Sequence, residues 1–104
     1  MSKFDNELDA ILYEMALEGA DTKTYADGSS VTIVDYIAPE DEQFTDWTPQ
    51  RLARLSAAQR EKAKAIRAAI VTERSDGIVE VKTFESSDMA CEYWQEIPDG
   101  DSED

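Results

Sequence analysis

The chain has 104 residues, of which 41% are hydrophobic, and a formal net charge of −14 without any histidine. This length fits one domain, and the composition is hydrophobic enough for a folded core. So negative a chain is a poor ligand for nucleic acid or anionic membranes, because most of its surface repels phosphates. We therefore expect a basic protein partner, with no direct binding to nucleic acid or to a membrane.

Membrane-spanning and secretory segments are missing from the sequence. No apolar run approaches the roughly 20 residues that cross a bilayer, and residues 1–5 lack the apolar segment of a signal peptide. The single cysteine, Cys91, cannot form an internal disulfide, which fits a reducing cytoplasm, and it is expected to be a small buried hydrophobe. We expect a cytoplasmic protein with one domain at residues 1–97 and an acidic flexible tail at residues 98–104.

The residue types that carry most enzyme chemistry are missing or isolated. Without histidine there is no serine–histidine or cysteine–histidine pair, and one cysteine cannot build a thiolate zinc site. The four glycines are scattered, so no phosphate-binding loop is present. Among 24 acidic residues, close carboxylate pairs arise by chance, and residues 99–103 lack the spacing of a calcium-binding EF-hand loop. We expect no enzymatic activity, no cofactor and no metal.

The first element is a helix predicted over residues 4–18. Ser2 with Asp5 gives a modest capping signal, and Gly19 suits the end of the helix. Apolar residues recur at helical spacing, which predicts a stripe that faces the core or, alternatively, a dimer interface. The stripe consists of Phe4, Leu8, Ile11, Leu12 and Met15.

A β-hairpin is predicted next. Asp27-Gly28 separates two segments, residues 22–26 and 29–37, that favour strands, and such a pair suits a turn with positive φ at both central positions. The nearly continuous apolar run from Val31 to Ile37 indicates a strand in the middle of its sheet, ended by Pro39.

The longest periodic segment predicts a central helix over residues 48–74. Thr48 suits the N-cap, Pro49 suits the first helical position, and Ser75-Asp76-Gly77 supplies the stop. The segment holds seven of the ten basic residues, whereas residues 1–47 and 75–104 are strongly acidic. Four of its basic residues are predicted to share a stripe, namely Arg60, Lys64, Arg67 and Arg74. The favoured interpretation is neutralisation by the acidic flanks; the alternative is a binding surface.

The remainder predicts a strand over residues 78–84 and a short helix that begins near Ser86, Ser87 and Asp88. That helix carries Met89, Ala90, Tyr93, Trp94 and Ile97. The predicted order is α-β-β-α-β-α. The sequence therefore predicts an α+β fold, in which a small three-stranded, mainly antiparallel sheet packs on one face against a long central helix and two further helices.

The acidic connection at residues 38–47 and the tail are the candidate partner-binding regions. Carboxylates beside aromatic side chains suit a basic groove, since aromatic residues often anchor interfaces. Trp47 is instead expected to fold the connection back onto the core. The candidate partner-binding residues are Glu40, Asp41, Glu42, Phe44, Asp46, Asp99, Asp101, Glu103 and Asp104.

In size and charge, and without a shared motif, the chain resembles the small acidic inhibitors that bacteriophages direct against host defence or DNA-handling proteins. These include DNA-mimicking, anti-restriction and anti-CRISPR proteins. The resemblance implies a decoy that binds a basic, nucleic-acid-handling protein in the cytoplasm of a bacterial host. The alternative is a dimeric accessory or regulatory module that docks through apolar helix faces, with acidity serving solubility. Salt would distinguish them, because screening weakens charge-driven binding far more than apolar docking.

Overall fold

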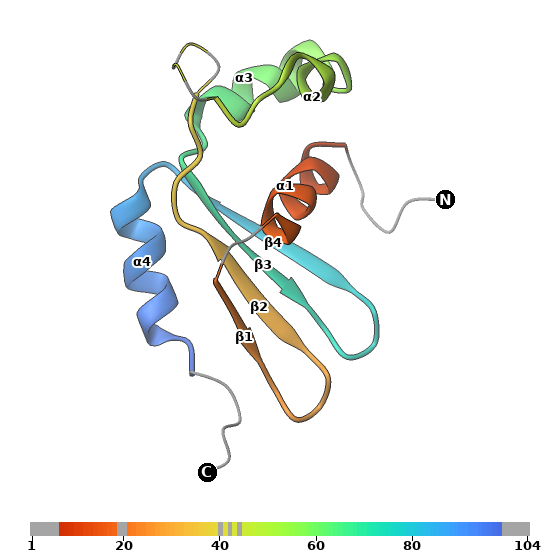
Figure 1. The fold of residues 1–104 in the computed structure, drawn as a ribbon, viewed down its shortest axis with the longest axis vertical. Helices are drawn as coiled ribbons and strands as arrows, with labels where there is room; N and C mark the ends of the chain where they lie inside the picture. The colour runs from red at the N-terminus through yellow and green to blue at the C-terminus, as the bar shows by residue number, and fades with distance from the viewer. Residues whose placement is uncertain (1–6, 19–20, 40, 42, 44, 99–104) are drawn as a thin grey trace.

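The computed structural model describes residues 7–18, 21–39, 41, 43 and 45–98. Within these residues the chain forms four helices and a four-stranded antiparallel sheet (Figure 1). In chain order they are α1 (Glu7–Leu17), β1 (Asp21–Thr24), β2 (Ser30–Val34), α2 (Pro49–Ala53), α3 (Ala57–Ala65), β3 (Ala68–Glu73), β4 (Val79–Phe84) and α4 (Ser87–Glu96). The fold is α+β, but the predicted three-stranded sheet is wrong, because β3 lies within the segment predicted as the central helix.

That segment, residues 48–74, is two short helices followed by a strand. Its predicted start is confirmed, since the Thr48 hydroxyl accepts a hydrogen bond from the Arg51 N–H at 3.2 Å and Pro49 follows it. Ser56 then begins α3 through a capping box, in which Ser56 and Gln59 exchange hydrogen bonds of 3.1 and 3.2 Å. An internal cap of this kind ends one helix and starts another, so the uniform helix propensity of the segment is overridden.

Two-sided burial explains why the last part of the segment is a strand. Ala68, Ala69, Ile70 and Val71 are each at most 3% exposed. Alternate residues of a strand face opposite sides of the sheet, so Ala69 joins the core under α1, whereas Ala68 and Ile70 join the core under α4. A surface helix buries one stripe only, so four consecutive buried residues are better hidden by a central strand.

The helices cover both faces of the sheet, which corrects the prediction of one covered face. On the α1 side the core also receives residues of α3 and of the connection before α2, including Trp47, which is 2% exposed. On the other side α4 contributes Ala90 and the partly buried Trp94 and Ile97. The α1 core consists of Leu8, Ile11, Leu12, Met15, Ile37, Trp47, Leu55, Ala63, Ile66 and Ala69. The predicted apolar stripe of the first helix is thus core wherever it is described; Phe4 lies outside the described residues.

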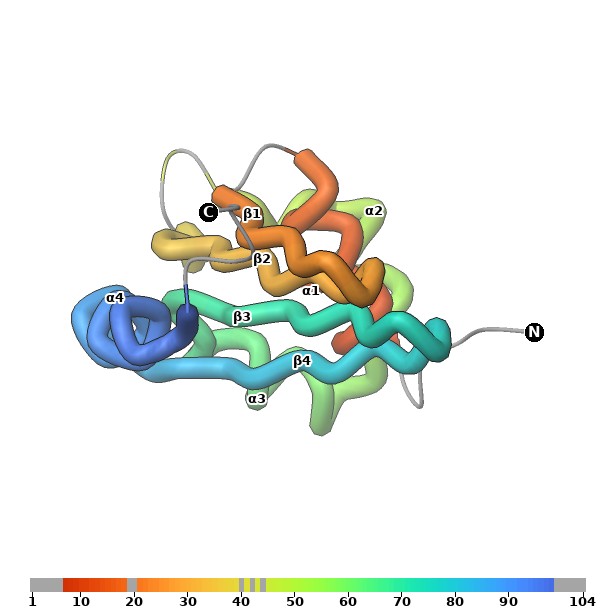
Figure 2. Tube along the Cα trace, turned by 90° about the horizontal axis from the view of Figure 1, so that it is seen from below, coloured from red at the N-terminus to blue at the C-terminus, as the bar shows by residue number. Residues whose placement is uncertain are grey.

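The strands follow one another in sequence order across the sheet (Figure 2). β2 pairs with β1 and β3, which confirms its predicted inner position, and β1 and β4 form the two edges. The predicted strand over residues 78–84 and the predicted helix capped near Ser86 are also confirmed, since the Ser86 hydroxyl accepts from the Met89 N–H at 3.2 Å.

Both hairpins close with the same five-residue turn. In the first, the Gly28 N–H donates to the Tyr25 carbonyl and the Tyr25 N–H donates to the Ser29 carbonyl, both at 3.0 Å. Gly28 has φ of +92° and Gly77, its counterpart in the second hairpin, has φ of +91°. Only the glycine takes positive φ in each turn, so the predicted pair of positive φ angles is wrong. Gly77 therefore joins β3 to β4 and does not end a helix.

Lys23 fastens the edge strand β1 to the end of α4. Its ammonium group donates to the carbonyl oxygens of Trp94 and Ile97 at 2.9 and 2.7 Å, and it lies 4.4 Å from the centroid of the Trp94 ring. The side chain is only 9% exposed. The Trp94 carbonyl group also accepts from the Ile97 N–H at 3.1 Å, so Lys23 adds a second, charged donor there and supplies a donor to the Ile97 carbonyl group at the helix end. The cation also interacts favourably with the negative end of the helix dipole.

We expect Lys23→Met to destabilise the fold by about 2 kcal/mol, because two carbonyl groups lose a charged donor while the apolar stem is largely retained. Urea unfolding followed by circular dichroism measures this change. Lys62→Met, at an exposed position on α3, is the matched control, and a change within about 0.5 kcal/mol is expected there. Equal midpoints for both variants would contradict the role assigned to Lys23.

Candidate protein-binding surface

Only Asp41 and Asp46 of the predicted partner-binding residues are described by the structure. Asp41 is exposed, whereas Asp46 is half-buried and its carboxylate accepts a hydrogen bond from the Ala38 N–H at 2.9 Å. Asp46 therefore closes the connection between β2 and α2. The other predicted residues lie outside the described residues, namely Glu40, Glu42, Phe44, Asp99, Asp101, Glu103 and Asp104.

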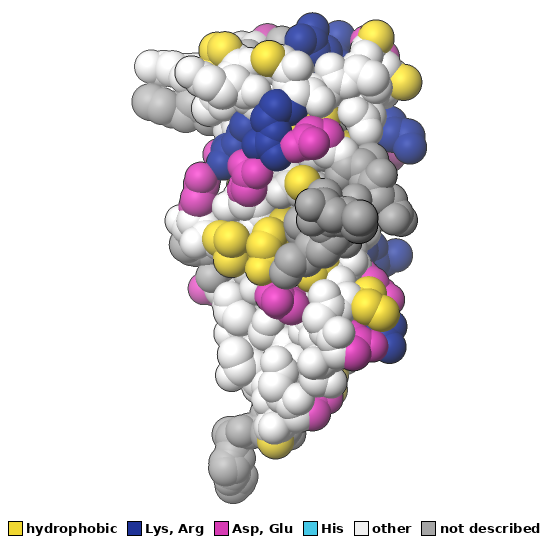
Figure 3. Space-filling model, turned by 90° about the vertical axis from the view of Figure 1, so that its right-hand side faces the viewer, with side chains coloured by type: hydrophobic (Ala, Val, Ile, Leu, Met, Phe, Trp, Pro, Cys, Tyr) yellow, Lys and Arg dark blue, Asp and Glu magenta, His cyan; other side chains and the backbone are white. Residues whose placement is uncertain are grey.

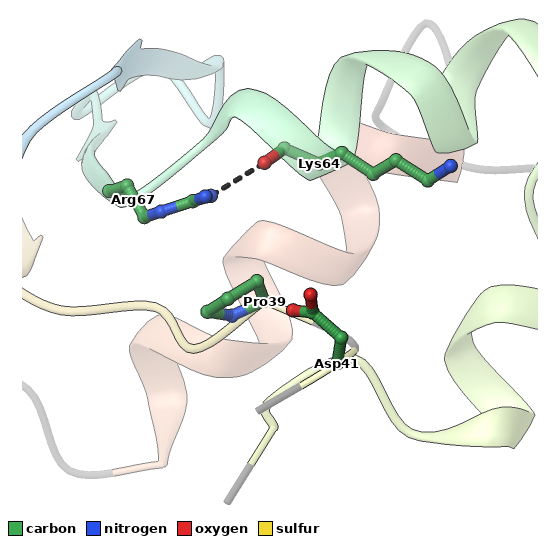
Figure 4. A pocket seen from close by; sticks show the side chains of 4 residues that line it. All are labelled: Pro39, Asp41, Lys64 and Arg67. Carbon is green, nitrogen blue, oxygen red and sulfur yellow. Dashed lines mark hydrogen bonds between the residues drawn. The ribbon is translucent and has the colours of Figure 1, made fainter. Parts of the chain in front are cut away.

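A hollow of about 600 Å³ beside Asp41 is also lined by Pro39, Lys64 and Arg67 (Figure 4). The Arg67 guanidinium points at the Lys64 carbonyl oxygen, to which it donates at 2.6 Å, and the Lys64 ammonium group points away from it. A carboxylate and two cationic side chains thus share the hollow. Their opposite charges give it no field of one sign that would select a charged ligand.

Two basic side chains, Arg51 of α2 and Arg54 at its C-cap, are neutralised by acidic side chains of α1 and by Glu18, which follows α1. Arg51 forms an ion pair with Glu18 at 2.7 Å, and Arg54 pairs with both Glu7 and Glu14, the latter at 2.9 Å. The hydrogen bonds that the Arg54 guanidinium donates to Glu7 and Glu14 raise the pKa of Arg54 above its ordinary value. Internal neutralisation, which the sequence analysis favoured for the basic segment, therefore holds for these two residues.

The four residues of the predicted basic stripe do not share one helix face. Arg60 and Lys64 lie on α3, Arg67 precedes β3, and Arg74 follows it. Lys64 pairs with Glu61 at 3.3 Å, and Arg74 pairs with Asp76 and Glu80 at 3.6 and 3.3 Å. The guanidinium groups of Arg60 and Arg67 donate to backbone carbonyl oxygens instead.

The side of the molecule shown in Figure 3 presents basic and acidic side chains next to one another. Such interspersed charges cancel over short distances, since screening at physiological salt acts over about 8 Å. This side therefore offers no extended field of one sign.

The outer face of α4 differs, because its carboxylates form no ion pair with any residue in the described part of the chain. Asp88, Glu92 and Glu96 are exposed, stand four residues apart, and form no ion pair within the described residues. Four residues of helix rise by about 6 Å, so the three carboxylates form a row along the helix. We call it the α4 acidic row. α4 contains no basic residue, so no side chain of the helix itself offsets the row.

Two large apolar side chains flank the α4 acidic row. Met89 is 54% exposed and Tyr93 is 42% exposed, and they lie four residues apart on the adjacent part of the helix surface. The Tyr93 ring lies 5.6 Å from the Phe84 ring, and the Lys82 ammonium group lies 5.4 Å from Tyr93. Aromatic side chains held in this way are favoured anchors of protein interfaces.

The sequence predicts α4 as a helix, but the carboxylates of α4 are not among the predicted partner-binding residues. The signal was available, because an acidic residue at every fourth position of a helix without a basic residue predicts an uncompensated row. What the sequence lacked was the position of the other basic residues. The structure shows that Arg51 and Arg54 are engaged by α1, not by α4.

Comparisons with known proteins give no match: no protein-family model matches the chain, and neither the curated proteins nor the solved structures contain a significantly similar one. In the described part of the chain, no group of three or more cysteine and acidic side chains is arranged to hold a metal ion. Among the described helices, none has the length and apolar character needed to cross a membrane.

Asp46→Ala is expected to destabilise the fold by about 1–2 kcal/mol, because the N–H of the buried Ala38 loses a charged acceptor. The exposed Asp41→Ala is the control, for which a change within about 0.5 kcal/mol is expected. Thermal unfolding of both variants gives the comparison. If Asp46→Ala unfolded like the control, Asp46 would be free to act as a partner-binding carboxylate, as the sequence analysis predicted.

Proposed function

We propose that the protein is a non-enzymatic acidic inhibitor that binds a basic, nucleic-acid-handling protein of a bacterial host, as phage counter-defence proteins do. The observation that carries the proposal is the α4 acidic row, in which Asp88, Glu92 and Glu96 are exposed without an ion-pair partner among the described residues. Uncompensated charge of one sign attracts a basic surface and accelerates association with it.

The spacing of the α4 acidic row argues for a mixed surface, not a pure imitation of DNA. Its carboxylates recur about every 6 Å along the helix axis, whereas one DNA strand carries a phosphate roughly every 3.4 Å of axis. The lower charge density leaves room for apolar contacts. Met89 and Tyr93 supply these next to the row, so the partner surface combines basic side chains with an apolar cleft.

The second candidate function is a dimeric accessory module that docks through an apolar helix face. α1 no longer suits that role, because Leu8, Ile11, Leu12 and Met15 are each at most 7% exposed in the chain's own core. Met89 and Tyr93 on α4 are exposed, and they support docking through the apolar face of that helix instead. The two functions differ in how their binding depends on salt.

The first experiment is capture of partners from a bacterial lysate with the tagged protein, eluted by a salt gradient and identified by mass. A basic nucleic-acid-binding protein that elutes at moderate salt and is displaced by duplex DNA would support the inhibitor. A partner that resists high salt would favour apolar docking through α4. Recovery of the tagged protein alone would contradict the inhibitor function.

Neutralising the α4 acidic row by Asp88→Asn, Glu92→Gln and Glu96→Gln together is expected to weaken partner binding by about tenfold, through the loss of three charge interactions of the usual size for exposed groups. Isothermal titration calorimetry at two salt concentrations measures the affinity and its salt dependence.

The matched control changes the net charge equally but removes carboxylates that already have basic partners, namely Glu7→Gln, Glu14→Gln and Glu61→Gln. Its affinity is expected to stay within about twofold of the unmodified protein. Equal losses in both triple variants would mean that net charge alone, and not the α4 acidic row, drives binding.

A further inference from the structure

β4 is an edge strand with an unpaired side. β4 pairs with β3 and is the last strand of the described sheet. A hollow of about 350 Å³ lies alongside it, lined in part by Val81, Thr83 and Lys62. An exposed strand edge presents N–H and C=O groups that can pair with another strand.

The register identifies which backbone groups point away from β3. The Arg74 N–H donates to the Ile78 carbonyl at 2.8 Å, and Glu80 and Lys82 stand opposite Thr72 and Ile70. Hydrogen-bonded and non-bonded pairs alternate along an antiparallel ladder, so the even-numbered residues of β4 exchange their bonds with β3. The N–H and C=O groups of the odd-numbered residues, Val79, Val81 and Thr83, therefore face outward.

We infer that two copies of this chain pair through β4, antiparallel and with Val81 opposite Val81 of the second copy, to make one continuous eight-stranded sheet. This register brings outward-facing residues opposite each other, as hydrogen bonding requires. It also places Glu80 opposite Lys82 of the second copy, and Lys82 opposite its Glu80. Both side chains are exposed, and the Glu80 carboxylate, which already pairs with Arg74 of its own chain at 3.3 Å, has further acceptor positions for Lys82 of the second copy.

The rest of the strand is equally self-complementary. Ile78, which is 50% exposed, stands opposite Phe84 of the second copy, next to the half-exposed Tyr93 of that copy. On the other face, the pairs are Val79 with Thr83 and Val81 with itself, all β-branched residues that pack well across strands. The dimer thus covers an apolar side chain that the single chain leaves in water.

Charge selects this register over its neighbours. Sliding the second copy by two residues in either direction keeps the backbone groups aligned, but it places Glu80 opposite Glu80 or Lys82 opposite Lys82. Like charges directly across a strand pair are unfavourable. A lone lysine on an edge strand discourages strand pairing. Here Glu80, two positions before Lys82, supplies the oppositely charged residue that faces Lys82 of the second copy.

The two-fold axis of this dimer stands perpendicular to the sheet, so the two α4 helices lie on the same side of the joined sheet. The two α4 acidic rows would then face one partner together. The pairing itself rests on β4 alone and does not depend on the proposed function.

The test is the mass of the protein in solution, measured by sedimentation equilibrium from micromolar to millimolar concentration. The unmodified chain is expected to form a dimer. Glu80→Lys alone and Lys82→Glu alone each place like charges opposite one another twice, so each is expected to weaken the dimer by about tenfold or more.

Mixing the two single variants is the decisive arm. One chain then presents lysine at both positions and the other presents glutamate at both, so a heterodimer is expected to form with an affinity close to that of the unmodified dimer. Glu96→Lys, on the last turn of α4, makes the same charge change away from β4 and is expected to leave the dimer intact. Thr83→Pro removes an outward-facing N–H without taking a bond from β3 and is expected to abolish the dimer.

A chain that stays monomeric up to millimolar concentration overturns the inference. A dimer that persists in Glu80→Lys and in Lys82→Glu, or a mixture that fails to associate, overturns it as well. Circular dichroism spectra that match the unmodified protein establish that each variant is folded.

Discussion

The burial of β3 on both of its faces is the constraint on which the rest of the structure depends. Four consecutive residues, Ala68 to Val71, are almost fully hidden, so each face of the sheet needs its own cover. α1 covers one face and α4 the other. The small side chains of Ala68 and Ala90 belong to the same cluster, which lets α4 approach the sheet closely. Removing apolar area of this kind from water contributes roughly 25 cal/mol per Å².

The two-sided architecture also divides the charge of the molecule. Arg51 of α2 and Arg54 at its C-cap meet the acidic side chains of α1 and Glu18, so this side approaches local neutrality. α4 lies on the opposite face of the sheet, beyond the reach of those guanidinium groups. The buried Lys23 of β1 lies next to α4, but its ammonium group is engaged by carbonyl groups at the end of that helix. Among the described residues, Asp88, Glu92 and Glu96 of α4 therefore remain exposed without an ion pair, and the proposed partner surface is built on these three carboxylates.

The open edges of the sheet give the fold a second means of association. β1 is tied to α4 through Lys23 and Tyr25, whose hydroxyl donates to the Pro98 carbonyl at 2.8 Å. β4 has no corresponding tie among the described residues, and its sequence alternates in a way that matches its own reverse. In the inferred dimer, β4 would pair the two copies, and the two α4 helices on one side of the joined sheet would bind the partner. Self-association and partner binding would thus use separate surfaces.

The sequence by itself determined the elements whose signals are local. The caps at Thr48 and Ser86, the hairpin at Asp27-Gly28, the apolar stripe of α1 and the inner position of β2 all follow from short-range patterns, and the structure agrees. Only the tertiary structure decided which parts of residues 54–74 form a helix and which form a strand. Alanine-rich, charged sequence has high helix propensity, and Ala68 to Val71 fit a helix as well as a strand until the cores on both sides of the sheet are known.

The same reason limits what the sequence determined about the surface. It supplied the total charge of −14 but not the pairing, because an ion pair between Arg54 and Glu14 joins residues 40 positions apart. From the sequence, Asp46 is predicted to be a partner-binding carboxylate, but in the structure it accepts a hydrogen bond from the Ala38 N–H. The α4 carboxylates were not selected from the sequence, because only the structure shows that they form no ion pair among the described residues. The pairing of Arg51 and Arg54 depends on α1 and α2 lying side by side, which only the tertiary structure reveals.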